Sequence, residues 1–466
     1  MNSRIAVLAL IGSLGVSGAL AQDWPQWRGP NRDAKAADFK APKTWPQELT
    51  QKWKVTVGEG VATPALVGNT LYVFSREQGN EITRAISAAD GKEQWQEKYE
   101  SLGATGGAAQ HSGPRSSPAV ANGKVVNIGV RGVISCLDAA TGKLLWRKDE
   151  FKSYPMFHPA SSPMIVDGLA IAQLGGRENG ALVAYDLTTG EQKWKVTGAS
   201  PAYSSPVLMT IGGAKLIIAQ TDSKLVAINA ADGKLAWESE AAPQAGGGGG
   251  GPGRGGGGRP DNKAATPIVD GQTIIMAGRG VKALKLEKAG DKFTATELWS
   301  NADKNLSFNT PTAKAGRLYG LTGNNELFCL SATDGKTLWS APFPTAPRAA
   351  LERLNVPPTF FGLLQDPPPG APRRPGGGAP GGPGGGGGGR GGGMGGGGGY
   401  GSIVDAGSVV FALTPGGQLI AFEPSDKEFK QLASYKVGSQ THAYPIVSGQ
   451  RIFIKDKDSL TLWTVE

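Results

Sequence analysis

The chain has 466 residues, with 48 Lys and Arg against 39 Asp and Glu and a net charge of +9. This basic excess is mild, and basic charge alone does not establish nucleic-acid binding. Only two cysteines are present, and no CxxC or HExxH motif occurs, which excludes the common zinc-site signatures.

The first element in chain order is a leader over residues 1–21. It has one basic residue before its core, Arg4, an uncharged apolar run over 5–16, and the small-x-small sequence Ala-Leu-Ala immediately before residue 22. These features predict a secretory signal peptide. We expect the product to be exported, to the periplasm or the extracellular space, and to have no transmembrane segment.

One short pattern then recurs along the chain, and "LDAATGKLLW" at 137–146 is one clear copy. In five copies a glycine falls four residues before a tryptophan. The aspartate and glycine favour a tight turn, and the indole can fill the gap between repeats while its N–H reaches a main-chain carbonyl. We therefore predict that tryptophans at these and equivalent places dock each repeat on the next; they are Trp53, Trp95, Trp146, Trp194, Trp237, Trp299 and Trp339.

The whole repeat is longer, and residues 116–146 show its form. Short apolar runs are separated by Asn122-Gly123, Arg131-Gly132 and Thr141-Gly142, so the unit predicts four short strands joined by hairpins. Eight such units fit, at about 42 residues each, close to the roughly 40–45 of four-stranded blades. The sequence therefore predicts an all-β fold, an eight-bladed β-propeller of four-stranded antiparallel blades.

Closure of the ring follows from the last unit, which ends after its third strand. Residues 50–55 form a strand that has no blade of its own. We expect this N-terminal strand to complete the eighth blade, because closure removes the open sheet edges.

The domain organisation has four parts. Residues 1–21 are the signal peptide, 22–48 form an N-terminal strap, and 49–466 form the propeller. Two glycine-rich insertions, near 241–262 and 365–400, are expected to be disordered, because they cannot bury enough apolar surface. Their arginines resemble RGG tracts, which leaves RNA or polysaccharide binding as an alternative, although we expect no nucleic-acid partner.

The consensus A-x-[DN]-x-x-[TD]-G-[KE]-x-x-W resembles the tryptophan-docking motif of pyrroloquinoline-quinone-repeat propellers, a quinoprotein-like group with WD40-like blades. Copies at 136–146, 184–194 and 227–237 carry the resemblance. It implies one of two branches. One contains quinone-dependent alcohol and sugar dehydrogenases, and the other is non-enzymatic and similar to the propeller lipoprotein of outer-membrane β-barrel assembly.

The dehydrogenase branch has requirements that the sequence does not meet in any local motif. Many alcohol-oxidising members place vicinal cysteines against the quinone, and they need a calcium site and an aspartate base. Here Cys136 and Cys329 lie in the second and sixth units, on opposite sides of the ring, so we expect two buried thiols and no disulfide between them. No cofactor and no metal are expected; pyrroloquinoline quinone with calcium belongs only to the dehydrogenase alternative.

One constellation of basic residues suggests a site. The three histidines all precede a proline that begins an inner strand, and three arginines lie in turns between second and third strands. These two loop classes share one face of a propeller, so we predict a cationic patch at the channel mouth for an anionic group. Solvated or loop-bracing side chains are the alternative, and a three-histidine metal site is weaker still. The predicted ligand-binding residues are His111, Arg115, Arg131, His158, Arg177, Arg279 and His442.

From these patterns we expect an exported, non-catalytic and monomeric propeller, a scaffold or binding module that presents one loop face to a protein, peptide or anionic ligand. The alternative is a quinone-dependent oxidoreductase. Because unperturbed histidine gains charge near pH 6.5, anion binding is expected to strengthen as the pH falls through that value.

Overall fold

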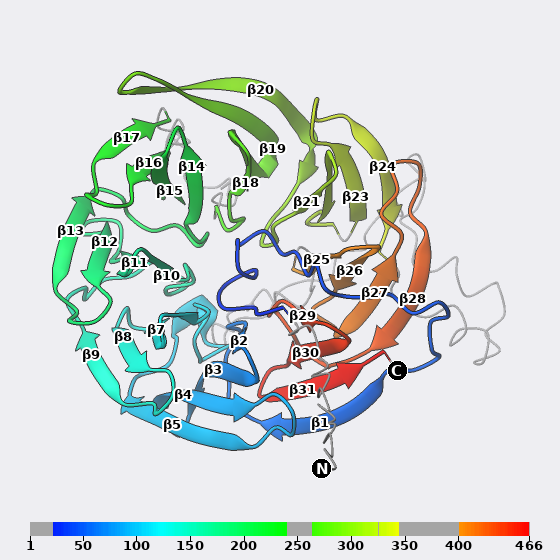
Figure 1. The fold of residues 1–466 in the computed structure, drawn as a ribbon, viewed down its shortest axis with the longest axis horizontal. Helices are drawn as coiled ribbons and strands as arrows, with labels where there is room; N and C mark the ends of the chain where they lie inside the picture. The colour runs from blue at the N-terminus through cyan, green and yellow to red at the C-terminus, as the bar shows by residue number, and fades with distance from the viewer. Residues whose placement is uncertain (1–21, 240–262, 325, 344–399, 466) are drawn as a thin grey trace, which may run out of the picture.

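The computed structural model describes residues 22–239, 263–324, 326–343 and 400–465. Eight antiparallel sheets stand around a central axis like the blades of a propeller (Figure 1). The prediction of an all-β, eight-bladed propeller is confirmed. The expected signal peptide and, apart from Tyr400, the two glycine-rich insertions lie outside the described residues.

The first four blades follow each other in the chain, and in each the strands run from the inner to the outer position. Their strands are β2 (Ala65–Val67), β3 (Thr70–Glu77), β4 (Asn80–Ser87) and β5 (Glu93–Glu100) in blade 1; β6 (Ala119–Ala121), β7 (Lys124–Ile128), β8 (Ile134–Asp138) and β9 (Leu144–Lys148) in blade 2; β10 (Met164–Val166), β11 (Leu169–Leu174), β12 (Ala181–Asp186) and β13 (Gln192–Thr197) in blade 3; and β14 (Val207–Ile211), β15 (Ala214–Gln220), β16 (Leu225–Asn229) and β17 (Leu235–Glu238) in blade 4. A short 3-10 helix, η1 (Gly106–Ala108), lies between blades 1 and 2.

The remaining blades continue in the same sense. Their strands are β18 (Ile268–Asp270), β19 (Thr273–Ala289) and β20 (Lys292–Asn305) in blade 5; β21 (Thr312–Lys314), β22 (Arg317–Leu321), β23 (Glu326–Ser331) and β24 (Thr337–Pro342) in blade 6; β25 (Ser402–Ala406), β26 (Val409–Leu413), β27 (Gln418–Phe422) and β28 (Gln431–Lys436) in blade 7; and β29 (Ile446–Ser448), β30 (Arg451–Lys455), β31 (Ser459–Thr464) and β1 (Thr50–Thr56) in blade 8.

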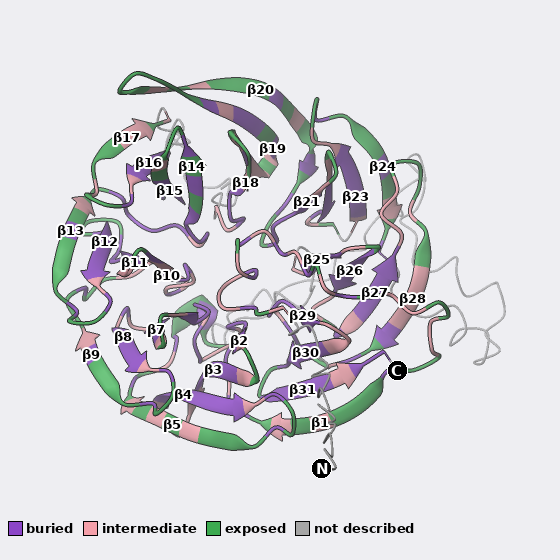
Figure 2. Ribbon diagram, viewed as in Figure 1, coloured by how far each residue is buried: buried purple, intermediate pink, exposed green. Residues whose placement is uncertain are grey.

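The ring closes as predicted. Strand β1 pairs antiparallel with β31, from Thr50 opposite Thr464 to Thr56 opposite Ser459. Blade 8 therefore takes its outer strand from the N-terminal part of the chain and its three inner strands from the C-terminal part. Burial follows the same radial order, because middle strands are buried and outer strands are largely exposed at the rim (Figure 2).

Tryptophan rings join neighbouring blades. A Cβ added to Gly142 would lie 2.5 Å from the Trp95 ring, so only glycine lets the indole lie on this turn. Trp53, Trp146, Trp194 and Trp299 lie in the same way on a glycine of the following blade. The indole N–H groups of these five tryptophans and of Trp339 each donate to a carbonyl of the following blade. The pairs are Trp53–Ala88, Trp95–Ala139, Trp146–Leu187, Trp194–Ala230, Trp299–Ala332 and Trp339–Ser425.

Blade 5 departs from this pattern. Its strand β19 folds back on itself, since the Leu286 N–H donates to the Gln272 carbonyl, and so it supplies both middle strands. The β19–β20 hairpin is long, and its Gly290 precedes Trp299 by nine residues instead of four. Among the described residues, Trp237 of blade 4 therefore meets no docking glycine, and its indole N–H donates to no carbonyl as those of the other six do.

The two cysteines are buried free thiols at equivalent places, Cys136 in β8 of blade 2 and Cys329 in β23 of blade 6. Burial raises the pKa of each thiol to about 12. Both therefore stay protonated and apolar, as small core residues.

A chain of hydrogen bonds runs around the axis at the start of the inner strands. Each main-chain N–H in it donates to the hydroxyl of the Ser or Thr at the equivalent place in the next blade. The bonds are Tyr444 to Thr63, Thr63 to Ser117, Ser117 to Ser162, Ser162 to Ser205, Ser205 to Thr266 and Thr266 to Thr310, at 2.8–3.3 Å. They link blade 8 to blades 1–6.

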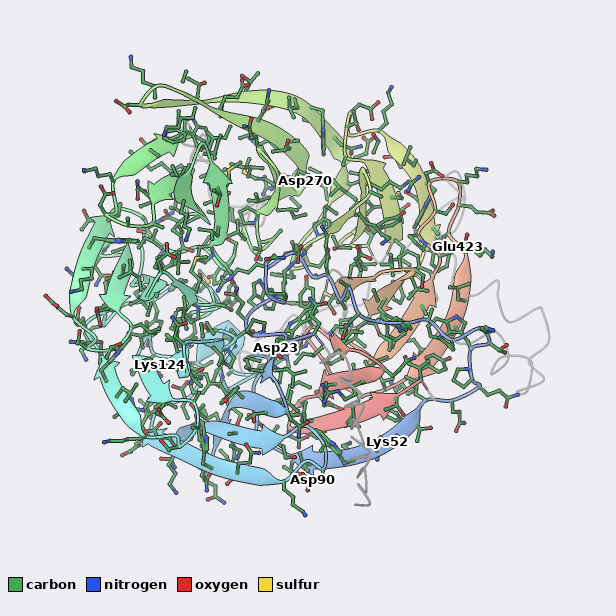
Figure 3. The ribbon with its side chains drawn as sticks, viewed as in Figure 1. Asp23, Lys52, Asp90, Lys124, Asp270 and Glu423 are labelled. Atoms are coloured by element: carbon green, nitrogen blue, oxygen red, sulfur yellow. The ribbon has the colours of Figure 1, made fainter. Side chains whose placement is uncertain are left out.

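Residues 22–48, the strap, cross one face of this ring (Figure 1). Asp23 marks their start near the middle of the molecule, whereas Asp90, Lys52 and Glu423 lie at the rim (Figure 3). Trp24 and Arg28 are fully buried, and Arg32 is 3% exposed.

The strap bonds to every blade. Main-chain atoms of its first part pair with Leu66 and Val120 in blades 1 and 2, and Ala34 and Ala36 pair with Asp405 in blade 7. Its side chains reach the other blades, in the pairs Arg32–Pro163, Arg32–Pro206, Trp27–Thr266, Arg28–Pro311 and Asp38–Gly449. One segment thus fixes all eight blades at the axis.

Candidate functional site

The face opposite the strap carries the predicted site residues. The strap contacts turns between first and second strands, including Gly68 and Gly449. The histidines and Arg115 lie in the loops that lead into inner strands, at the other end of the blades. The strap therefore covers one face of the channel and leaves the opposite face to these loops.

Four rings from separate loops meet at this mouth. Phe308 and Tyr400 stack with centroids 4.3 Å apart and an interplanar angle of 7°. His442 meets Tyr400 edge-on at 4.9 Å, and His111 meets His442 at 4.8 Å. We call Phe308, Tyr400, His442 and His111 the aromatic row.

Two members of the aromatic row are not fully packed or paired. Phe308 is 38% exposed. The Nδ1 atom of His442 is buried and has no hydrogen-bond partner among the described residues. The row thus has one partly exposed apolar ring and one buried ring nitrogen without a partner.

Arg115 lies beside this row but is held by its own loop. Its guanidinium donates to the carbonyls of Ala108, His111 and Gly113 at 2.9–3.2 Å. Burial lowers the pKa of Arg115, and the neighbouring Tyr400 and Tyr203 oppose that shift. Its positive charge is therefore fixed in place behind the mouth.

His158 is 1% exposed and belongs to a different group. Its Nε2 accepts the Thr105 N–H at 3.0 Å, and its Nδ1 lies 3.1 Å from the Val130 carbonyl, which an Nδ1–H tautomer satisfies. Both ring nitrogens are therefore used in joining the loops of blades 1, 2 and 3.

Arg131 joins the same loops. It donates to the carbonyls of Leu102 and Gly103 and to the Tyr154 hydroxyl, and it lies over the Tyr154 ring at 5.4 Å. Tyr154 in turn stacks on His158 with centroids 4.8 Å apart. Arg131 and His158 thus form a second group beside the aromatic row.

The last two predicted residues lie in neither group. Arg177 follows β11 with 84% of its side chain exposed, and its Nε lies 3.8 Å from an Asp222 oxygen. Arg279 lies at an exposed position within β19, the strand that supplies both middle strands of blade 5. The structure therefore brings together His111, Arg115 and His442, and separately His158 and Arg131.

The histidines differ electrostatically from free imidazole. Burial lowers the pKa of all three, and it lowers that of His442 to about 4, with His111 and Arg115 adding to the shift. The expected gain of charge at pH 6.5 therefore moves to more acidic pH. At neutral pH the imidazole rings at the mouth are therefore neutral, and Arg115 supplies the positive charge there.

Sequence reasoning missed Phe308 and Tyr400. Phe308 lies four residues before β21 and Tyr400 two residues before β25, in the loop class where the histidines also occur. An aromatic residue in any loop of that class is therefore the sequence signal for these two residues.

The described parts of the chain bring no three His, Cys, Asp or Glu side chains together as a possible metal-binding group. A hard cation needs several oxygen ligands. Arg28 and Arg32 occupy the strap side of the channel with positive charge instead.

Among the residues that the structure describes, no helix is long and apolar enough to span a membrane.

The sequence comparisons decide the family. The family model described as outer membrane protein assembly factor BamB matches residues 79–341 and 285–357. The chain belongs to this family. A BamB from Yersinia pestis is 26% identical over 308 residues, which cover 62% of this chain and 70% of that protein.

Quinoproteins are also similar to this BamB-family chain, over a smaller share of their length. The quinohemoprotein alcohol dehydrogenase ADH-IIG of Pseudomonas putida is 28% identical over 201 residues, 41% of this chain but only 27% of that protein. The chain thus spans about a quarter of that enzyme.

Solved structures show the shared fold. BamB from Moraxella catarrhalis matches with a TM-score of 0.54 at 12% identity, covering 89% of this chain and 97% of that one. Quinohemoprotein alcohol dehydrogenase from Comamonas testosteroni matches with a TM-score of 0.60 at 14% identity, covering 95% and 80%. At such identities the likeness concerns the propeller alone, so the BamB family and the quinoprotein enzymes share this architecture.

Proposed function

We propose that this protein is an exported, non-catalytic binding module that presents the face opposite the strap to a protein or peptide partner. One observation carries the proposal: the strap covers one face of the ring, whereas the other gathers the aromatic row and Arg115 at the channel mouth. Export rests on the leader sequence. A BamB-like protein partner is supported by the family of the chain.

The chemistry of the mouth indicates what the partner contributes. The Phe308–Tyr400 stack offers an apolar ring face, and Arg115 supplies a fixed positive charge close behind it. An aromatic or aliphatic side chain beside a carboxylate fits this pairing. Aromatic and arginine residues are also the side chains that dominate binding energy at protein interfaces.

Photo-crosslinking tests the proposal. Benzoylphenylalanine replaces Phe308 in one variant and Lys234 in a control. Lys234 lies in the turn between the third and fourth strands of blade 4, at the strap end of the blades, with 83% of its side chain exposed. We expect a protein adduct from position 308 in the exported fraction and none from position 234. Adducts from position 234 alone would contradict the proposal.

Quinone-dependent oxidation is the second candidate, because the likeness to ADH-IIG covers 41% of the chain. We propose that no quinone is bound, which the arginines in the channel and the lack of grouped His, Cys, Asp or Glu side chains among the described residues support. Mixing the purified protein with pyrroloquinoline quinone and Ca²⁺ tests this. A shift of quinone absorbance with dye-linked alcohol or sugar oxidation would favour the oxidoreductase.

A further inference from the structure

Asp38 of the strap accepts hydrogen bonds from two distant parts of the chain. Its Oδ2 atom accepts the main-chain N–H of Gln22 at 2.6 Å and that of Gly449, in the turn between β29 and β30, at 2.7 Å. The contact with Gln22 closes the first part of the strap into a loop, and this loop carries Arg28 and Arg32 into the channel. Asp38 thus joins both ends of the loop to blade 8.

The second oxygen of this carboxylate has no donor. The Oδ1 atom of Asp38 is buried and has no hydrogen-bond partner among the described residues. A buried acceptor without a donor costs free energy, so its presence calls for an explanation. Burial lowers the pKa of the nearby Arg451, and Asp38 opposes that shift, but the Arg451 guanidinium donates to Asn69 and Ser448.

Gln22 is also the first residue after the predicted leader. Removal of residues 1–21 converts its peptide N–H into an α-ammonium group. A peptide nitrogen donates one hydrogen, whereas an ammonium group has three hydrogens and a positive charge. The new group can therefore donate to both oxygens of Asp38, including the one that has no partner.

We propose that removal of the leader creates an ion pair between the α-ammonium group of Gln22 and the carboxylate of Asp38, which fixes the strap in the mature protein. The proposal rests on the export that is part of the proposed function, because residues 1–21 must be removed. It goes further in giving the new chain end a defined binding site on the propeller.

The ion pair has a chemical consequence for Gln22. An N-terminal glutamine cyclises when its uncharged α-nitrogen attacks its own Cδ; the N–Cδ bond forms, the Cδ–Nε2 bond breaks, and ammonia leaves. Asp38 favours the protonated nitrogen, which cannot attack. The side-chain amide is also held, since Nε2 donates to the Lys35 carbonyl at 3.2 Å and Oε1 accepts the Ala37 N–H at 2.7 Å. The folded mature protein therefore keeps an uncyclised glutamine.

Mass spectrometry of the exported protein tests the proposal. We expect its N-terminal peptide to begin with Gln22 in the uncyclised form. During incubation at neutral pH, ammonia loss from this residue should be at least about tenfold slower in the folded protein than in urea, because cyclisation then requires local opening of the strap.

Variants assign the protection to the ion pair. Asp38→Asn keeps an oxygen acceptor for Gly449 but removes the charge, and it should cyclise at least about threefold faster than the unchanged protein. Glu48→Gln, at an exposed position of the strap, is the matched control and should stay within about twofold. Circular dichroism melting shows whether Asp38→Asn is folded.

A chain that retains Ala21 provides a second measurement, which does not depend on a folded Asp38→Asn variant. Its amino group is displaced from Asp38 by one residue, so it should melt at a lower temperature than the mature chain.

Four outcomes would overturn the proposal. They are a mature chain that begins elsewhere than Gln22, equal cyclisation in the folded and unfolded protein, equal cyclisation in folded Asp38→Asn and the unchanged protein, and equal melting temperatures with and without Ala21. An uncleaved leader would contradict the proposed export as well. Crosslinking from position 308 does not involve the chain end, so the four outcomes leave the channel-mouth proposal intact.

Discussion

Arg32 of the strap donates to the main-chain carbonyl of Pro206, 174 residues later, at 2.8 Å. The same guanidinium reaches Ser162 and Pro163, so one side chain ties blade 3 to blade 4. Burial lowers the pKa of Arg32 to about 9, which leaves it charged at neutral pH.

Arg32→Ala should lower the free energy of unfolding by about 3–5 kcal/mol, since hydrogen bonds to charged groups each contribute about 1.5–3 kcal/mol. Urea unfolding followed by fluorescence measures the loss. Arg177→Ala, at an exposed position, is the control and should change stability by less than about 0.5 kcal/mol. Equal effects of the two changes would show that the strap does not stabilise the ring.

Removal of residues 22–56 should cause aggregation. The deletion takes away both the strap and β1, and it leaves the edges of β31 and of the neighbouring blade without cover. Size-exclusion chromatography with light scattering measures the outcome. A truncated protein that remains monomeric with an unchanged melting temperature would contradict the role of β1 in closure.

The tryptophans should differ in their contribution to stability. Trp146→Ala and Trp194→Ala each remove a ring packed on a glycine and a buried N–H bond, and each should cost about 3–5 kcal/mol. Trp237→Ala should cost less than about 2 kcal/mol, because none of the described glycines lies against its ring and its N–H donates to no described carbonyl. Denaturant titration of the three variants compares them directly, and similar losses in all three would contradict this ranking.

Gly142→Ala and Gly123→Ala separate backbone strain from steric clash. Both glycines have positive φ, +74° and +67°, but an added Cβ at Gly142 would meet Trp95 at 2.5 Å whereas one at Gly123 meets nothing within 4 Å. The two variants share the backbone strain, so Gly142→Ala should be less stable than Gly123→Ala by about 1–3 kcal/mol, the usual range for overpacking. Their chemical-denaturation midpoints provide the test.

The pKa of His442 gives a pH prediction. Its folded value of about 4 lies below the 6.5 of a free imidazole, so the unfolded chain binds the proton more readily. The stability that His442 contributes is complete above pH 6.5 and is lost as the pH falls through about 4. In His442→Gln the decline in urea midpoint between pH 6.5 and 4 should therefore be shallower, and an identical decline would contradict the assignment.

Much of the fold was predictable because its signals are local. A glycine four residues before a tryptophan specifies both a turn and its contact with the preceding blade, and this pair recurs in five of the eight repeats. The place of the strand at 50–55 was predictable from the number of strands, because the eighth repeat has only three and a closed ring leaves no strand unpaired. Because the glycine–tryptophan pattern occurs several times in one chain, each copy supports the same prediction of a turn and a blade contact.

The site was less predictable because it depends on which loop residues meet across the axis. His158 and His442 occupy similar places in their repeats, yet one is saturated with main-chain hydrogen bonds and the other retains a free ring nitrogen. The path of the strap was also hidden, since nothing local shows that Arg28 and Arg32 enter the channel.

The pairing of Thr50 with Thr464 has a kinetic consequence. The two strands are separated by nearly the whole chain, and contacts of such long range are formed slowly. The outer strand of blade 8 is synthesised before every other blade strand, but it cannot reach its place until the three strands beside it exist. During synthesis β1 must therefore remain unpaired while the other seven blades assemble. The first blade strand to be made is thus the last to find its partner.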